Sequence, residues 1–134
     1  MGFNNEGVDK ILERLKSYKG SMIIGANIGK NKNTPNEEAI NDYLHCFIKL
    51  RNFVDYFVIN VSSPNTPNLR DLQEKSKISA ILKSIQSENK KEKLVPILLK
   101  ISPDLSKDQV RDIVGVCLSN KIDGIIVANT TISR

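Results

Sequence analysis

The chain has 134 residues, a net charge of +5 and 40% hydrophobic residues, which is typical of one globular domain with a buried core. No apolar run approaches the roughly 20 residues that a membrane-spanning helix needs, so neither a transmembrane segment nor a signal peptide is expected. The lysines are scattered, and the one dense run, at 90–93, falls between a helical and a strand pattern. It is interpreted as a solvated loop, and nucleic acid is not expected as a partner.

The first half of the chain alternates helical and strand patterns. Apolar residues at helical spacing predict a helix over 9–18, and an apolar run predicts a strand over 22–27. Thr34 at an N-cap and Glu37 at N3, with proline at N1, form a capping box that opens a second helix. A second strand is predicted over 56–61. The apolar stripe expected for the second helix consists of Ile40, Tyr43, Leu44, Phe47 and Ile48.

The second half repeats this alternation. A third helix is predicted over 72–87 and a third strand over 94–100. Ser106 and Gln109 form another capping box, which opens a fourth helix, and a fourth strand is predicted over 124–129. The apolar stripe expected for the fourth helix consists of Val110, Ile113, Val114, Cys117 and Leu118.

The strands are short, continuous runs of Ile, Val and Leu without clean alternation, a pattern typical of parallel strands buried on both faces. Their alternation with helices predicts parallel βαβ units, in either a doubly wound sheet or an arc of a (β/α)8 TIM barrel. There is no GxGxxG or Walker loop to favour the first. The barrel is favoured because polar residues close all four strands at the end that carries barrel active sites: Asn27, Asn60, Lys100 and Asn129.

A complete barrel needs about 200 residues or more, so about four parallel strands alternating with helices form only part of one. Both edges of the sheet are expected to be unpaired. Residues 1–134 are therefore interpreted as one partial barrel domain, a fragment or a truncated gene product.

Both cysteines fall on the apolar stripes of expected helices. Buried thiols at Cys46 and Cys117 are favoured over a disulfide or a reactive site. His45 has no second His, Cys or carboxylate at metal-ligand spacing, and is expected on a helix surface. The sequence therefore predicts no metal and a reducing compartment.

The most informative segment, Asn-Val-Ser-Ser-Pro-Asn-Thr-Pro-Asn-Leu-Arg over 60–70, carries a buried strand into a polar loop on the expected active face. Asparagine side chains offer a donor and an acceptor each, which suits a planar ring with alternating C=O and N–H groups. This loop resembles the active-site loop of dihydroorotate dehydrogenases. The resemblance extends over the whole chain through motifs at 2–5, 25–32, 60–67, 99–105, and 122–124 with 129–131. Ser63 indicates the quinone-linked class, because the soluble classes place a cysteine there.

The resemblance implies oxidation of (S)-dihydroorotate to orotate, in pyrimidine biosynthesis, with FMN as hydride acceptor and a quinone as final electron acceptor. Ser63 matches the catalytic base that removes the C5 proton. A lone serine is a poor base, so its proton must leave through a relay or water in a closed site. The positions that match substrate contacts are Asn4, Asn5, Glu6, Gly7, Val8, Asn60, Ser62, Asn65, Thr66, Asn129 and Thr130. The positions that match FMN contacts are Asn27, Asn60, Lys100 and Ala128.

Two residues depart from the family pattern. Ala128 stands where relatives commonly have Thr or Ser against FMN, which removes one hydroxyl contact worth about 1 kcal/mol. Asn68 stands where Gly is usual, and the loop is still expected to form because Asn tolerates positive φ.

The family resemblance also places important parts outside this chain. The loops that hold the FMN phosphate follow Arg134, and the helical pair that binds membrane and quinone precedes the barrel. The chain alone is therefore expected neither to bind FMN tightly nor to turn over. The parent enzyme is expected at the inner mitochondrial membrane in a eukaryote, or at the cytoplasmic membrane in a bacterium. A non-catalytic half-barrel, a dihydropyrimidine-specific flavoenzyme and a soluble-class dehydrogenase remain as alternatives.

Overall fold

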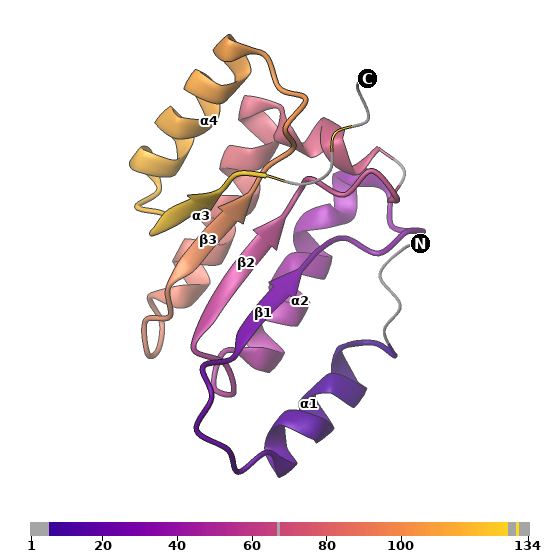
Figure 1. Cartoon of the computed structure of the whole chain (residues 1–134), viewed down its shortest axis with the longest axis vertical. Helices are drawn as coiled ribbons and strands as arrows, with labels where there is room; N and C mark the ends of the chain where they lie inside the picture. The colour runs from indigo at the N-terminus through magenta and orange to yellow at the C-terminus, as the bar shows by residue number, and fades with distance from the viewer. Residues whose placement is uncertain (1–5, 67, 129–130, 132–134) are drawn as a thin grey trace.

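The computed structural model describes residues 6–66, 68–128 and 131, which form a parallel sheet with helices packed against it (Figure 1). The elements in chain order are helix α1 (Val8–Ser17), strand β1 (Gly25–Ile28), 3-10 helix η1 (Asn36–Glu38), helix α2 (Ala39–Leu50), strand β2 (Tyr56–Asn60), 3-10 helix η2 (Leu69–Gln73), helix α3 (Lys75–Asn89), strand β3 (Ile97–Lys100), helix α4 (Lys107–Ser119) and strand β4 (Gly124–Ile126).

The strands are ordered β1-β2-β3-β4, and each neighbouring pair is parallel. This confirms the predicted alternation of helices and parallel strands. Among the described residues, β1 and β4 are the edges of the sheet, as expected. Figure 1 shows α2, α3 and α4 on one side of the sheet, with α1 beside α2.

The two faces of the sheet have different roles. The ring of Phe57 lies 4.6 Å, centroid to centroid, from that of Phe47 in α2, so Phe57 faces the helices. Because successive side chains of a strand point to opposite faces, Val58 and Asn60 face away from them. The register pairs Asn60 with Lys100. The face opposite the helices therefore carries the polar strand ends.

The predicted strands begin too early in two cases. Met22 and Ile23 are 73% and 80% exposed and precede β1, and Leu94 is 66% exposed and precedes β3. The ladder begins only where a neighbouring strand offers a partner, at the pairs Gly25–Tyr56 and Phe57–Ile97. Apolar content alone cannot locate this starting point.

The two predicted capping boxes have different outcomes. At α4 the box is confirmed: the Gln109 N–H donates to Ser106 Oγ at 3.2 Å, and the Ser106 N–H donates to Gln109 Oε1 at 2.9 Å. At Thr34 the prediction was wrong, because a 3-10 turn intervenes and α2 begins only at Ala39. Thr34 belongs to the preceding loop, where its carbonyl accepts a hydrogen bond from Lys30 Nζ at 2.5 Å.

The predicted apolar stripe of α4 was also partly wrong. Ile113 and Cys117 are buried, but Val110, Val114 and Leu118 are exposed, Leu118 by 74%. In the described part of the chain α4 packs against α3, which covers only one side of it. Ile48 of α2 is exposed in the same way, while the other members of its predicted stripe pack on the core.

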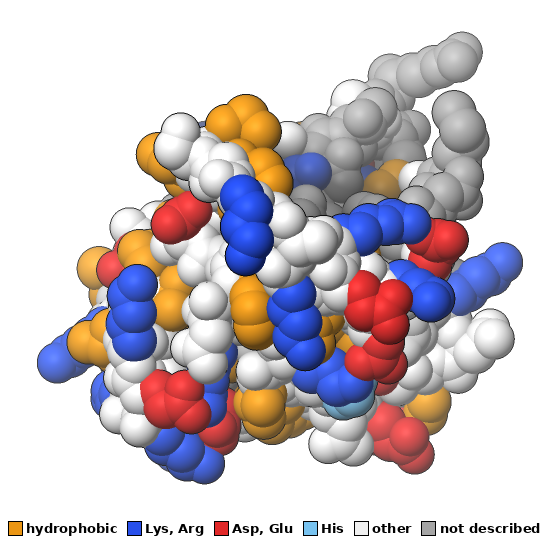
Figure 2. Space-filling model, turned by 90° about the horizontal axis from the view of Figure 1, so that it is seen from below, with side chains coloured by type: hydrophobic (Ala, Val, Ile, Leu, Met, Phe, Trp, Pro, Cys, Tyr) orange, Lys and Arg blue, Asp and Glu red, His pale blue; other side chains and the backbone are white. Residues whose placement is uncertain are grey.

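The face at the N-terminal ends of the strands, seen from below in Figure 2, mixes basic, acidic and hydrophobic side chains without a block of one charge. Arg51, which follows α2, is buried and forms ion pairs with Glu88 at 3.4 Å and with Glu92. No helix among the described residues is long and apolar enough to cross a membrane.

Candidate functional site

Three of the four predicted strand-end residues lie on one face of the sheet. Asn60 and Lys100 end β2 and β3 and are register partners. Asn27 is the third residue of β1, and it pairs in register with Val58, so its exposed side chain lies on the same face as Asn60. The fourth, Asn129, lies outside the described residues. The structure thus places on one face three of the four side chains that were predicted to contact a cofactor.

Asn60 is the centre of this arrangement. Its side chain is almost fully buried, and its Oδ1 accepts hydrogen bonds from the backbone N–H of Ser62 at 3.0 Å and from the Ser62 hydroxyl at 2.8 Å. The Asn60 Nδ2 is buried and has no hydrogen-bond partner within the described part of the chain. A buried donor without a partner is costly, so this amide is ready to donate to a ligand.

Ser63, the predicted catalytic base, comes directly after Ser62 and is 4% exposed. Its Oγ accepts a hydrogen bond from the backbone N–H of Asn65 at 3.3 Å, which leaves the hydroxyl proton for another acceptor. Ser62 and Thr66 of the same loop are also buried, whereas Asn65 is exposed. The loop therefore holds the serine hydroxyl away from bulk water.

The serine loop ends at Asn68, whose backbone has the positive φ that asparagine was expected to tolerate there. Asn68 is left-handed, with φ 56° and ψ 9°, and precedes η2. Its backbone carbonyl accepts a hydrogen bond from Asn36 Nδ2 at 2.9 Å. The prediction that the loop forms with Asn in place of Gly is thus confirmed.

Tyr43, which was predicted only as part of an apolar stripe, also supports the site. Its hydroxyl donates to the Asn60 carbonyl at 2.9 Å and accepts from the backbone N–H of Lys30. Burial is the main cause that raises the pKa of the Tyr43 phenol, so it remains a neutral donor. Lys30 is itself buried, and its Nζ donates to the Asn31 carbonyl at 3.2 Å.

Arg70 and Asp104 were also missed, although Arg70 ends the polar segment over 60–70 and Asp104 belongs to the motif at 99–105. Arg70 Nε donates to the Ser62 carbonyl at 3.2 Å, and an Arg70 terminal nitrogen lies 2.7 Å from Asp104 Oδ2. The Thr131 hydroxyl donates to the other carboxylate oxygen of Asp104. The sequence did offer a signal for this pair: a basic and an acidic residue, one in each of two loops that follow strands on the expected active face.

The predicted N-terminal substrate segment is only partly described. Gly7, which has φ 89°, and Val8 line a hollow of about 460 Å³ together with Asn27, between α1, β1 and α2. Glu6 instead pairs with Arg14 at the surface. The structure therefore places Gly7 and Val8 near the β1 end of the site, and the serine loop does not line this hollow. The other two predicted residues of the segment, Asn4 and Asn5, lie outside the described residues.

At the β4 end of the site, Ala128 is half-buried and follows the strand. Of its predicted neighbours, Asn129 and Thr130 lie outside the described residues.

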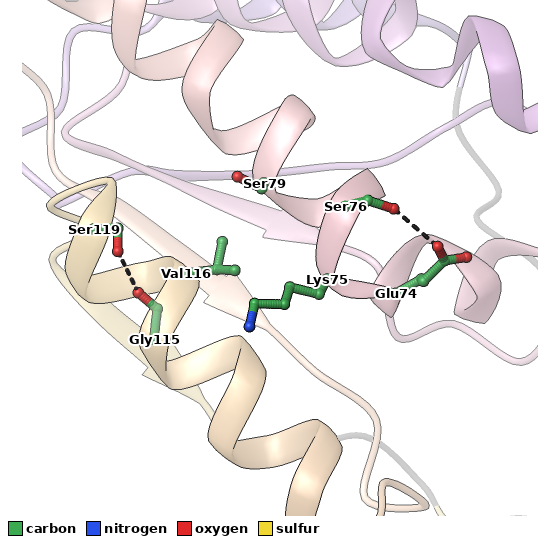
Figure 3. A pocket seen from close by; sticks show the side chains of 7 residues that line it. All are labelled: Glu74, Lys75, Ser76, Ser79, Gly115, Val116 and Ser119. Atoms are coloured by element: carbon green, nitrogen blue, oxygen red, sulfur yellow. Dashed lines mark hydrogen bonds between the residues drawn. The ribbon is translucent and has the colours of Figure 1, made fainter.

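A larger groove, of about 620 Å³, lies between α3 and α4 (Figure 3). Lys75 projects toward α4, where it pairs with Asp112, and the Ser119 hydroxyl donates to the Gly115 carbonyl. None of the predicted site residues lines this groove. Within the described ranges there is no cluster of three or more His, Cys, Asp or Glu residues that could hold a metal ion.

Both cysteines are free thiols. Cys117 is buried, as predicted, and Cys46 is half-buried. Burial raises the pKa of the Cys117 thiol to about 11 and raises that of Cys46 as well. A raised pKa keeps both thiols protonated and unreactive near neutral pH. His45 is exposed on α2, as expected.

A family model described as dihydroorotate dehydrogenase matches residues 1–134. The chain is 55% identical over 135 residues to a Christiangramia forsetii protein named dihydroorotate dehydrogenase (quinone), covering all of this chain and 39% of that protein. A Pseudoalteromonas translucida protein of the same name is 47% identical over 139 residues, covering all of this chain and 41% of that protein.

Two crystal structures of an Eimeria tenella protein have a similar fold. The structure titled as DHODH in complex with ferulenol matches with a TM-score of 0.90 and 36% identity over 99% of this chain and 42% of that one. The ligand-free structure matches with a TM-score of 0.89 and 36% identity over 98% of this chain and 43% of that one. The chain thus spans less than half the length of each relative, and its four parallel strands with their helices are part of a TIM barrel. It belongs to the dihydroorotate dehydrogenase family, in the group whose curated members are quinone-dependent.

Proposed function

We propose that this chain is the part of a quinone-dependent dihydroorotate dehydrogenase that supplies the catalytic base and one wall of the flavin site. The reaction is the oxidation of (S)-dihydroorotate to orotate, in pyrimidine biosynthesis. The observation that carries the proposal is the buried Nδ2 of Asn60, which has no hydrogen-bond partner among the described residues and lies on the open face of the sheet, two residues before Ser62. The names of the relatives support the choice of substrate and electron acceptor.

The residues on this face fit FMN as the cofactor. Asn60 offers an amide donor that has no partner in the described part of the chain, and Asn27 and Lys100 lie on the same face of the sheet. A positive charge at Lys100 would stabilise a reduced, anionic flavin ring. When bound, FMN would supply a hydride acceptor for C6 of dihydroorotate. Ala128 offers no hydroxyl, so it would not supply a hydrogen bond to the flavin at that position.

In this proposal, residues of this chain remove the C5 proton of dihydroorotate. Ser63 Oγ takes up the C5 proton while its own hydroxyl proton passes to a hydrogen-bonded relay or a bound water, and the N–H of Asn65, which donates to Ser63 Oγ, stabilises the negative charge left on that oxygen as its own proton leaves. Burial of Ser62, Ser63 and Thr66 excludes water from the reacting carbon. The exposed amide of Asn65 is available to the pyrimidine edge of the substrate. The predicted contacts at Asn4, Asn5, Asn129 and Thr130 complete the substrate site in this proposal.

The rest of the enzyme lies in segments that this chain does not contain. The relatives are more than twice as long as this chain. We place the remaining strands of the barrel, and the loops proposed to hold the FMN phosphate, in the part that this chain does not cover. Contact with quinone and association with the membrane are proposed for a segment that precedes the barrel. The enzyme would then work at the inner mitochondrial membrane in a eukaryote or the cytoplasmic membrane in a bacterium. The chain alone is accordingly proposed to be inactive and to bind FMN weakly.

A graft tests this function with the chain's own residues. Residues 1–134 replace the matching segment of the Christiangramia forsetii protein, with which they are 55% identical. The purified graft is assayed for reduction of dichlorophenolindophenol with dihydroorotate and, separately, with dihydrouracil. Activity with dihydroorotate alone supports the proposal. A flavin-loaded graft that oxidises only dihydrouracil, or neither compound, contradicts it.

A further inference from the structure

Arg70 lies where the serine loop meets the loop that follows β3. Its Nε donates to the carbonyl oxygen of Ser62 at 3.2 Å, and a terminal nitrogen donates to Asp104 at 2.7 Å. Both charged side chains are only 20% exposed. One guanidinium group therefore joins two loops of the active face, in a partly buried setting where such a pair is weakly screened by solvent.

The carbonyl that Arg70 holds belongs to the peptide that joins Ser62 to Ser63. Because a peptide unit is planar, fixing this oxygen also fixes the N–H and the Cα of Ser63. The preceding peptide is held as well, since the Ser62 N–H donates to the Asn60 side chain at 3.0 Å. The backbone that carries the Ser63 hydroxyl is thus held by hydrogen bonds to both of these peptides, and Arg70 supplies one of them.

Asp104 is held on its other sides, so it is a firm anchor for Arg70. Its backbone N–H donates to Ser102 Oγ at 3.2 Å, and the Ser102 N–H donates to Gln73 Oε1 at 2.8 Å. The Thr131 hydroxyl binds the carboxylate oxygen that Arg70 does not use. The Arg70–Asp104 pair therefore lies between the loops that follow β2, β3 and β4.

We propose that Arg70, anchored by Asp104, is a positioning residue that sets the orientation of Ser63 for proton removal from the substrate. This inference rests on the proposed function and adds to it a residue that touches no reacting atom. Lysine cannot replace Arg70 fully, because a single ammonium group lacks the planar fork that reaches a carbonyl and a carboxylate at once.

The test uses the graft described above and its Arg70→Gln, Arg70→Lys and Asp104→Asn variants. Arg111→Gln is the matched control, since Arg111 also pairs with an aspartate, Asp108, but both side chains are at least 80% exposed. The rate of flavin reduction by dihydroorotate is measured per bound flavin under anaerobic conditions. This normalisation separates a misplaced serine from a poorly folded protein, which would merely carry less flavin.

For Arg70→Gln we expect kcat per bound flavin to fall about 10- to 100-fold, because displacement of a catalytic group by about 1 Å has effects of this size. The KM for dihydroorotate should change little, and Arg70→Lys should recover only part of the rate. Combining Arg70→Gln with Asp104→Asn should cost little more than Arg70→Gln alone, because both changes break one interaction. If Arg70→Gln matches Arg111→Gln per bound flavin, or loses only flavin content, the inference is wrong.

A second measurement does not depend on activity. Amide hydrogen exchange over 61–66 is compared between Arg70→Gln and Arg111→Gln in the same graft. We expect exchange in this segment to accelerate about 10-fold in Arg70→Gln, with α2 unchanged as an internal reference. If the unmodified graft binds flavin but does not oxidise dihydroorotate, the proposed function fails. Exchange then decides the inference alone, and an unchanged rate over 61–66 overturns it.

Discussion

The hydroxyl of Tyr43 donates a hydrogen bond of 2.9 Å to the backbone carbonyl of Asn60. Tyr43 lies on α2 with no exposed surface, and its hydroxyl also accepts a hydrogen bond from the backbone N–H of Lys30. One phenol therefore joins a helix, the end of β2 and the loop after β1. The helical layer thus fixes the backbone of Asn60, whose buried amide nitrogen has no partner within the described ranges.

We predict that Tyr43→Phe destabilises the protein by about 1–3 kcal/mol, because it leaves the buried Lys30 N–H and Asn60 carbonyl without this partner. Urea unfolding measures the change. Tyr56→Phe is the matched control: Tyr56 is half-buried on β2, and its hydroxyl has no hydrogen bond among the described residues. An equal effect of the two substitutions would show that the Tyr43 hydroxyl contributes nothing specific.

A second prediction concerns the left-handed backbone of Asn68, at φ 56°. Asn68→Ala should cost about 1–2 kcal/mol, because a Cβ without a local hydrogen-bonding group is unfavourable there. Asn68→Gly should be neutral or slightly stabilising, because glycine adopts this conformation freely. Thermal unfolding compares the unmodified protein with the two variants. If Asn68→Ala is as stable as Asn68→Gly, the left-handed backbone at this position does not disfavour alanine.

These positions show how far the sequence could predict the structure. The parallel βαβ order, the capping box at Ser106 and the positive φ allowed at Asn68 follow from local rules about periodicity, caps and backbone freedom. The strand ends Asn60 and Lys100 were also found, because parallel strands bring their carboxyl ends to one edge of the sheet.

What the sequence could not predict depends on contacts between segments far apart in the chain. The bond from Tyr43 to Asn60 spans 17 residues, and the pair of Arg70 with Asp104 spans 34. Local patterns contain no information on such partners. Thr34 failed for a more local reason: its signature fits an N-cap, but Lys30, four residues earlier, holds its carbonyl in the loop.

A third prediction concerns the free energy of unfolding at low pH. The Lys91 ammonium, which donates to Glu88 at 2.6 Å, is the main cause that lowers the pKa of Glu88, and Arg51 lowers it further. The pKa values of Asp9 and Glu74 are lowered as well, mainly by hydrogen bonds from Lys49 and Ser76 respectively.

A carboxyl whose pKa is lower in the folded state contributes stability above its unfolded pKa, near about 4.3 for glutamate, and loses it as pH falls through the folded value. The free energy of unfolding should therefore decrease between about pH 5 and pH 3. Glu88→Gln and Lys91→Gln should both reduce this decrease, as measured by urea unfolding across that range. If both variants keep the full decrease, the pair does not act as described.

A fourth prediction concerns the thiols. With a pKa of about 11, Cys117 is thiolate in only about one molecule in a thousand at pH 8. In a Cys46→Ser variant, Cys117 is the chain's remaining thiol, and Ellman's reagent should modify it far more slowly than a free peptide thiol. Urea should restore the ordinary rate. Rapid modification of the native protein would show that Cys117 is not buried.

The most direct test of the central claim is flavin reduction by dihydroorotate in the graft and in its Ser63→Ala variant at neutral pH. Ser87→Ala, at an exposed serine of α3, is the control. Loss of a general base predicts a rate at least about 100-fold lower per bound flavin for Ser63→Ala, with Ser87→Ala unchanged. Equal rates in all three proteins would contradict the claim that this chain supplies the catalytic base.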